Sequence, residues 1–178
     1  MAPLEVLQFP DLRLKRTSTP VDQVDDALRA LAAEMIRVMY DEPGIGLAAP
    51  QVGQAIRMVV MDTGWNEDGG ERKPTVILNP EIVSREGTIL WEEGCLSVPD
   101  FTAEVERSER VVVRYRDLDG NELTEDVTGL RAVCFQHEID HLDGILFIDR
   151  ISRLKRSLYV KRRKKQLREE EEPASFGI

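Results

Sequence analysis

The sequence predicts an α+β domain in which antiparallel-rich β-sheets pack around a central helix, with a further helix near each end of the chain. Apolar residues recur at helical spacing between residues 22 and 39. Short β-branched runs bounded by turn residues fill the middle of the chain. A second helical pattern carries the string H-E-I-D-H at residues 137–141. Short strands flanked by helices in this way are typical of the α+β class.

The N-terminal segment, residues 6–21, is expected to be irregular because Pro10 and Pro20 interrupt it. Asp22 is a plausible N-cap for the first helix. The apolar face of this helix comprises Val24, Leu28, Leu31, Met35, Val38 and Met39. Pro43-Gly44 then ends the helix and opens the loop GIGLAAPQ at residues 44–51.

The β pattern begins with an apolar run at residues 56–62, and a polar loop follows at residues 63–74. Asp119-Gly120-Asn121 predicts a hairpin turn, and Gly144 suits the C′ position of the H-E-x-x-H helix. A last helix is expected from about Ser152. Further strands are predicted at residues 75–78, 81–85, 88–91, 111–116 and 123–127.

The composition is that of a soluble globular protein, with 42% hydrophobic and 32% charged residues in a chain of 178. The N-terminus has no apolar signal-peptide core, and no apolar run approaches the length of a membrane-spanning helix. We therefore expect a cytoplasmic protein without a membrane partner. Cys95 and Cys134 are then expected to be reduced thiols or metal ligands rather than a disulfide.

The net charge of −9 is unevenly distributed. Nine of the 24 basic side chains lie in residues 153–168, which contain no acid, and four glutamates follow at 169–172. Such a basic arm often has a polyanionic partner. The alternative is a solvated amphipathic helix that turns Leu154, Leu158 and Val160 or Lys161 toward the body of the protein. The sequence alone favours neither.

His137 and His141 are the only histidines of the chain and lie four residues apart. On a helix both imidazoles can bind one metal ion, and Glu138 lies within reach of a water held there. The alternative is a helix with two solvated or core histidines. The same helix face is apolar, so a metal site on it would be partly buried. Its members are Leu130, Val133, Cys134, His137 and His141.

A catalytic site of this kind needs a third protein ligand and an open position for water. No histidine follows His141, and Asp143 and Asp149 give no clear peptidase-type third ligand. Cys95 is a better candidate, because a thiolate with two imidazoles suits a borderline or soft divalent ion. Its alternative role is that of a small buried hydrophobe. Cys134 lies on the same helix as the histidines, and we interpret it as a pocket wall.

Three segments together identify a family. GIGLAAPQ at 44–51, EGCLS at 93–97 and QHEIDH at 136–141 resemble the three signature motifs of peptide deformylase, in the same order. FPDLRLKRTSTPV at 9–21 also resembles the N-terminus of that family. The similarity covers nearly the whole chain to about Arg150.

The resemblance implies a hydrolase that releases formate from the N-terminal formylmethionine of newly synthesised proteins. Cys95, His137 and His141 would hold one divalent ion, typically Fe(II) in this family, with zinc, nickel or cobalt also accepted. Glu138 would act as general base on the water at the metal and then pass the proton to the departing amine. The Gln51 side-chain amide and the Leu96 backbone N–H would stabilise the oxyanion. A loop-capping amide is the alternative for Gln51.

The same resemblance implies a pocket for the methionine side chain. Trp91 is a bulky residue in this pocket and predicts that the pocket differs in shape from that of other family members. Gly46 and Gly94 would let the peptide backbone come close, and Arg107 would touch the peptide main chain unless it is merely solvated. The remaining residues that match the family's pocket are Ile45, Leu130, Val133 and Cys134.

We expect residues 1–152 to form a single catalytic domain, to which the basic helix and acidic tail at 153–178 are appended. By resemblance, residues 153–168 can dock on the ribosome through rRNA phosphates, and the protein is expected to be a monomer. An H-E-x-x-H metallopeptidase is the nearest rival enzyme, and it would need a third ligand downstream. A ribosome- or RNA-binding module with a structural metal is the non-enzymatic rival.

Overall fold

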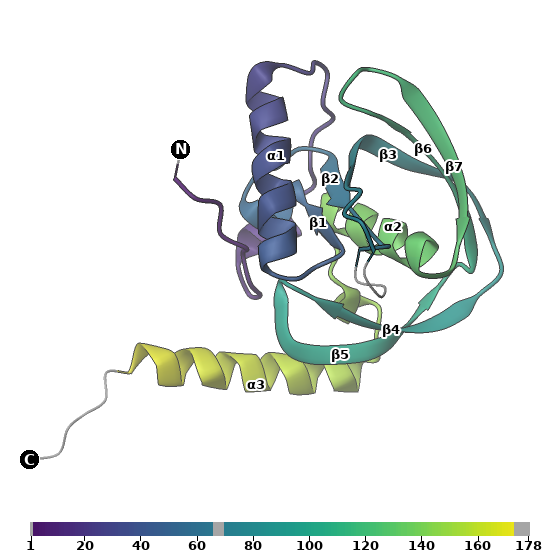
Figure 1. Cartoon of the computed structure of the whole chain (residues 1–178). Helices are drawn as coiled ribbons and strands as arrows, with labels where there is room; N and C mark the ends of the chain where they lie inside the picture. The colour runs from purple at the N-terminus through teal and green to yellow at the C-terminus, as the bar shows by residue number, and fades with distance from the viewer. Residues whose placement is uncertain (1, 66–69, 173–178) are drawn as a thin grey trace, which may run out of the picture.

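Helix α2 (Gly129–Leu142), which carries both histidines, lies at the centre of the fold and contacts both sheets (Figure 1). The computed structural model describes residues 2–65 and 70–172. The described residues form a five-stranded antiparallel sheet of order β1-β2-β3-β6-β7 and a two-stranded sheet of β4 and β5. The predicted α+β class is therefore confirmed. The strands are Gly46–Ala48 (β1), Met58–Met61 (β2), Thr75–Glu86 (β3), Ile89–Cys95 (β4), Val98–Arg107 (β5), Arg110–Arg116 (β6) and Glu122–Thr128 (β7).

Helix α1 (Asp26–Asp41) is capped by Asp25 and not by Asp22, so the predicted start was wrong. The Asp25 side chain accepts a hydrogen bond of 2.8 Å from the Leu28 backbone N–H. The Asp22 carbonyl instead accepts one from Arg116 at 3.3 Å, which places this residue in the loop before the helix. The predicted apolar face packs against β2, with Leu28, Met35, Val38 and Met39 buried and Val24 and Leu31 partly buried. Ala32 is also buried, although it was not predicted.

Strand β3 is continuous across Pro80, where the sequence pattern predicted a break between two strands. Its register with β6 shifts between Leu78 and Glu81, so the proline lies in a bulge. Asn79 has a φ of 51° there, and its side chain exchanges two hydrogen bonds of 2.8 Å with the Val21 backbone. Residues 66–69 of the predicted polar loop lie outside the described part of the chain.

The N-terminal segment ties together two loops that flank the candidate site. The Leu7 N–H donates to the Gln51 carbonyl at 2.7 Å, and the Phe9 N–H donates to the Ser97 carbonyl at 2.8 Å. Apart from the 3₁₀ turn η1 (Leu12–Lys15), the N-terminal segment is irregular, as its prolines predicted. Gln51 lies in a second 3₁₀ turn, η2 (Ala49–Val52).

Helix α2 ends where the sequence predicted. Gly144 follows the C-cap Asp143 with a φ of +74°, a conformation that favours glycine. A Cβ on Gly144 would lie 2.4 Å from the Lys15 carbonyl oxygen, so space as well as backbone conformation requires glycine. The chain then passes through the 3₁₀ turn η3 (Phe147–Asp149) to the last helix.

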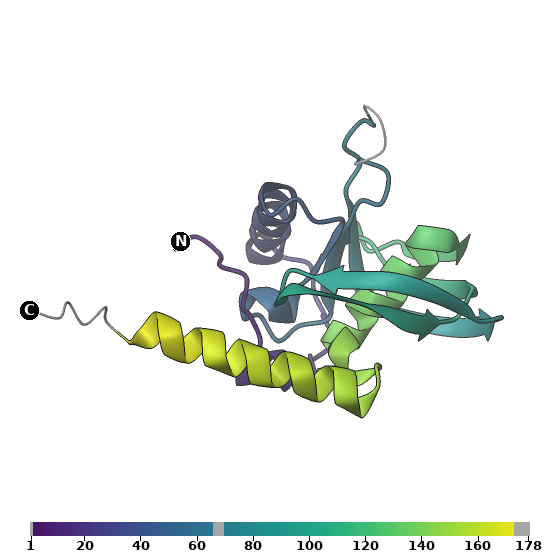
Figure 2. The ribbon, with the colours of Figure 1, turned by 90° about the horizontal axis from the view of Figure 1, so that it is seen from below.

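Helix α3 (Arg153–Glu171) is capped by Ser152, as predicted, and lies along β5 (Figures 1 and 2). The inward face considered from the sequence was wrong for its leucines, because Leu154 and Leu158 are 69% and 60% exposed. Val160 of that face is partly buried against the core. Tyr159 and Arg163 are buried instead. The Tyr159 ring packs on aromatic rings of the body, and the buried Arg163 guanidinium donates hydrogen bonds to the N-terminal segment. These contacts determine the inner face of α3, and the charge-rich sequence of the helix does not reveal them. Residues 173–178 of the predicted acidic tail lie outside the described residues. Among the helices of the described part, none has both the length and the apolar character of a membrane-spanning segment.

Candidate metal centre and active site

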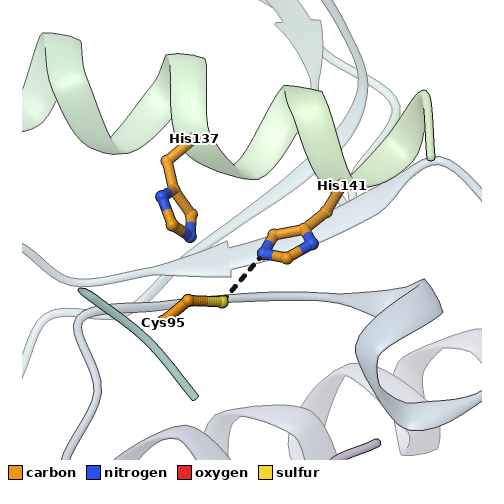
Figure 3. A group of neighbouring side chains, drawn as sticks. All are labelled: Cys95, His137 and His141. Carbon is orange, nitrogen blue, oxygen red and sulfur yellow. Dashed lines mark hydrogen bonds between the residues drawn. The ribbon is translucent and has the colours of Figure 1, made fainter. Parts of the chain in front are cut away.

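Cys95, His137 and His141 come together in one group, although the first two lie 42 positions apart in the chain. One ligand atom from each lies within 4.8 Å of the others, and the Cys95 Sγ lies 3.3 Å from the His141 Nε2 (Figure 3). The histidines project from one face of α2, as their spacing predicted, and the cysteine ends β4. Tertiary structure thus supplies the third ligand that the helix alone could not.

The donor set fits a divalent metal ion. In a tetrahedral zinc site, a cysteine sulfur and a histidine nitrogen lie about 3.6 Å apart, given typical bond lengths to the metal. The observed separation of 3.3 Å requires only a small adjustment. A thiolate with two imidazoles suits iron, zinc, nickel or cobalt, and the three ligands leave a fourth position available.

Glu138 lies beside this group with a buried carboxyl. Its side chain is 4% exposed, and its Oε2 atom has no hydrogen-bond partner among the described residues. Burial raises the pKa of Glu138 to about 7. A Cβ on Gly46 would lie 2.6 Å from the Oε1 atom of Glu138 and 3.0 Å from the Cys134 sulfur. The Gly46 position in β1 therefore leaves the space that this carboxyl occupies.

Gln51 turns its amide nitrogen toward the metal ligands. The Ala48 backbone N–H donates to the Gln51 Oε1 at 2.8 Å, which fixes the direction of the amide. The Nε2 atom then donates to the Ser97 hydroxyl at 3.1 Å and contacts the Cys95 sulfur at 3.7 Å. Gln51 is thus a loop-capping amide and a residue that faces the site at the same time, so the two interpretations are compatible.

A chain of buried charges lies behind His137. Its Nδ1 atom lies 2.7 Å from the Glu93 Oε1, and Arg107 donates two hydrogen bonds to the same carboxylate at 2.7 and 2.9 Å. Arg107 also donates to Asp140 at 2.7 Å, and Asp140 accepts two further hydrogen bonds from Arg150. Although burial alone would raise it, Arg107 and His137 hold the pKa of Glu93 down to about 2.

Arg107 therefore requires a correction. The sequence predicted that it touches the peptide main chain, but its side chain is 3% exposed and does not line the cavity at the metal group. The two carboxylates on neighbouring elements hold it in the interior, where an unpaired guanidinium would be costly. No periodicity in the sequence distinguishes this arginine from a solvated one.

A cavity of about 610 Å³ opens beside the metal group. Most predicted site residues line it, whereas Phe101 and Thr102 of β5 line it without having been predicted. Their position in an alternating strand beyond the EGCLS segment was the only available signal. The predicted residues in the lining are Ile45, Gly46, Gln51, Trp91, Gly94, Cys95, Leu96, Leu130, Val133, Cys134, His137 and Glu138.

The chain is similar to known proteins of one family over nearly its whole length. The polypeptide deformylase family matches residues 3–157. Peptide deformylase of Alkalilimnicola ehrlichii is 50% identical, with 95% of this chain and 93% of the relative covered. That of Rhodopseudomonas palustris strain BisB5 is 48% identical over 91% of this chain and 93% of the relative.

Solved structures give the same result for the fold. A peptide deformylase from Legionella pneumophila is 42% identical with a TM-score of 0.87, covering 97% of this chain and 100% of that chain. One from Synechococcus elongatus, in complex with actinonin, is 38% identical with a TM-score of 0.85, covering 92% and 89%. Since the matched region includes the metal group, the cavity and both sheets, the chain belongs to the polypeptide deformylase family.

Proposed function

We propose that this protein removes the formyl group from the N-terminal formylmethionine of newly synthesised proteins and releases formate. One observation supports this most strongly. The buried carboxyl of Glu138, whose Oε2 atom has no hydrogen-bond partner in the described part of the chain, lies in the same cavity as the group of three metal-binding side chains. Family membership gives the reaction, and the geometry gives each side chain a role in it.

Cys95, His137 and His141 would hold one divalent ion, with Fe(II) as the proposed native metal and zinc, nickel or cobalt as alternatives. When bound, the ion supplies Lewis acidity, which favours ionisation of water and stabilises negative charge on a carbonyl oxygen. Glu93 keeps His137 in one orientation by accepting the hydrogen bond of its Nδ1.

Glu138 is the proposed general base. Its carboxylate takes a proton from the water whose oxygen forms a bond to the formyl carbon. As the bond between that carbon and the methionine nitrogen breaks, Glu138 gives the proton to the nitrogen. Formate and a free amino terminus result, and the carboxylate is regenerated. The buried position of Glu138 supports this role, since its Oε2 atom accepts no hydrogen bond from any of the described residues and is free to bind a water.

The developing negative charge on the formyl oxygen needs hydrogen-bond donors. We assign this role to the Gln51 Nε2 and the Leu96 backbone N–H, because both residues line the cavity beside Cys95. The bond from the Ala48 N–H to the Gln51 Oε1 orients the amide before substrate arrives. Such preorganised donors cost no rearrangement during the reaction.

The methionine side chain fits the apolar part of the cavity. Trp91 adds a bulky wall to this part, and Gly46 and Gly94 let the peptide backbone approach β1 and β4. Cys134 contributes as a neutral thiol, because burial raises its pKa well above the ordinary value. The other apolar walls are Ile45, Leu130 and Val133.

The alternative function, that of an H-E-x-x-H metallopeptidase, would need a third metal ligand downstream of His141, and the two candidate aspartates there already have basic partners. Asp143 accepts a hydrogen bond from Arg57 at 2.8 Å, and Asp149 accepts one from Lys15 at 2.6 Å. Neither belongs to the metal group found in the described residues. The proposed function is tested by incubating metal-loaded protein with formyl-Met-Ala-Ser and acetyl-Met-Ala-Ser. Formate without acetate is the expected result, and cleavage between amino acids would favour the rival.

We also propose that the solvent-facing side of α3 contacts rRNA phosphates, so that the enzyme works at nascent chains in the cytoplasm. Arg162 and Arg163 are occupied by hydrogen bonds to the body, whereas Lys161 and Lys164 are exposed. Reversing the charge of Lys161 and Lys164 should weaken co-sedimentation with ribosomes, most at low salt. Unchanged co-sedimentation would leave α3 with a packing role only.

A further inference from the structure

A second, smaller cavity of about 400 Å³ lies between β5 and α3. Two of its lining residues, Phe101 and Thr102, also line the cavity at the metal group, so the two cavities adjoin along β5. We call this second cavity the α3 groove. Its other lining residues are Ala103, Lys155, Leu158, Tyr159 and Arg162.

The α3 groove has a definite chemical character. Leu158 is 60% exposed, and the lining contains aromatic and aliphatic side chains. Lys155 and Arg162 add two positive charges, and none of the described residues that line the groove is acidic. Tyr159 is only 2% exposed, and its hydroxyl has no hydrogen-bond partner among the described residues. An extended segment with one apolar and one acidic side chain would match this surface.

The distance from the metal group to the groove matches a short stretch of peptide. The rings of His137, Phe147, Phe101 and Tyr159 follow one another with centroid separations of 6.2, 6.0 and 4.8 Å. The first and last rings are therefore at most about 17 Å apart, which an extended chain covers in about five residues. Since this sum is an upper limit, an extended peptide whose first residue is at the metal group can reach the groove by its fifth or sixth residue.

We propose that the α3 groove binds the fifth and sixth residues of the substrate polypeptide, with a preference for one apolar and one acidic side chain at these positions. This inference rests on the proposed function, because it takes the metal group as the position of the formyl group. The walls shared by the two cavities give the peptide a continuous path. The groove would thus extend the recognition of nascent chains beyond the methionine pocket.

The test compares two eight-residue formyl peptides that differ only at positions five and six. One carries leucine and glutamate there, and the other carries serine at both. We expect kcat/KM to be about fivefold higher for the first peptide, which corresponds to about 1 kcal/mol of additional binding. Leu158→Asp should reduce this ratio to less than twofold. Leu123→Asp, which changes a 39% exposed leucine on β7, is the matched control and should retain the ratio.

Lys155→Glu tests independently whether the positive charge of the groove causes the preference for an acidic side chain. With this variant, a peptide with lysine at position six should become a better substrate than its glutamate counterpart. A ratio near one in the wild type, or an equal effect of Leu158→Asp and Leu123→Asp, would overturn the proposal. Formyl-Met-Ala-Ser has no fifth or sixth residue, so its turnover reports on the proposed function alone. If that peptide is not hydrolysed, both proposals fail.

Discussion

The buried charge chain behind His137 makes a strong prediction about Arg107. Replacement by methionine keeps much of the side-chain volume but removes three hydrogen bonds of 2.7 to 2.9 Å to Glu93 and Asp140. The side chains of Glu93 and Asp140 are only 4% and 9% exposed. Breaking a buried ion pair by removal of one partner typically costs about 3–5 kcal/mol. Because Arg150 still pairs with Asp140, we expect the lower end of that range.

Urea denaturation measures this loss directly. With a typical slope of about 1–3 kcal/mol per molar urea, the Arg107→Met midpoint should fall by at least about 1 M. Arg114→Met is the matched control, because that arginine is 47% exposed and pairs with the exposed Glu81. Its loss should cost about 0–1 kcal/mol. An Arg107→Met variant as stable as Arg114→Met would refute the reasoning.

The same variant should also loosen the metal, because Arg107 holds the carboxylate that orients His137. Removal of such supporting groups typically lowers metal affinity about 10- to 100-fold. The dissociation rate of Co(II), followed with a chromogenic chelator, gives a readout that does not depend on turnover. Arg107→Lys should restore the metal affinity only in part, since an ammonium group cannot form the paired hydrogen bonds of a guanidinium.

Three further predictions concern the cavity and its metal. Gly46→Ala should displace Glu138 and cut formate release at least tenfold, because the added Cβ would lie 2.6 Å from its Oε1; wild-type rates would show that the carboxyl has room to move. Gln51→Leu should lower kcat by about 10²–10³ with a small change in KM, as expected for a lost oxyanion donor; a change confined to KM would assign Gln51 to ground-state binding. Protein loaded with Fe(II) should lose activity in air faster than protein loaded with Ni(II), as repeated activity assays would show; equal stability would count against iron as the native metal.

Local chemistry explains which parts of the site could be predicted. The spacing of His137 and His141 determines their shared helix face without any knowledge of the rest of the fold. Cys95 could be proposed because its thiol completes a sensible donor set, although residues far apart in sequence must come together for it to bind. The prediction of Gln51 and of most residues that line the cavity rested on the resemblance to a known family. The structure places these residues together, and their catalytic roles stay predictions.

The remaining features depend on tertiary contacts that no local pattern reports. Arg107 is buried because Glu93 and Asp140 approach it from two other elements. Tyr159 replaces the leucines on the inner face of α3 because aromatic rings of the N-terminal segment and β5 lie opposite it. The continuity of β3 through Pro80 depends on a bulge in which the Asn79 side chain is hydrogen-bonded to the Val21 backbone outside the strand. In each case the partner is distant in sequence.

The central claim is that Glu138 moves the proton at a metal site built from Cys95, His137 and His141. The most direct test is formate release from formyl-Met-Ala-Ser by Glu138→Gln protein whose metal content equals that of the wild type. General acid–base catalysis is typically worth about 10²–10⁴, so kcat should fall by that factor while the metal stays bound. A metal-replete variant that retains more than a tenth of the wild-type kcat would contradict the account.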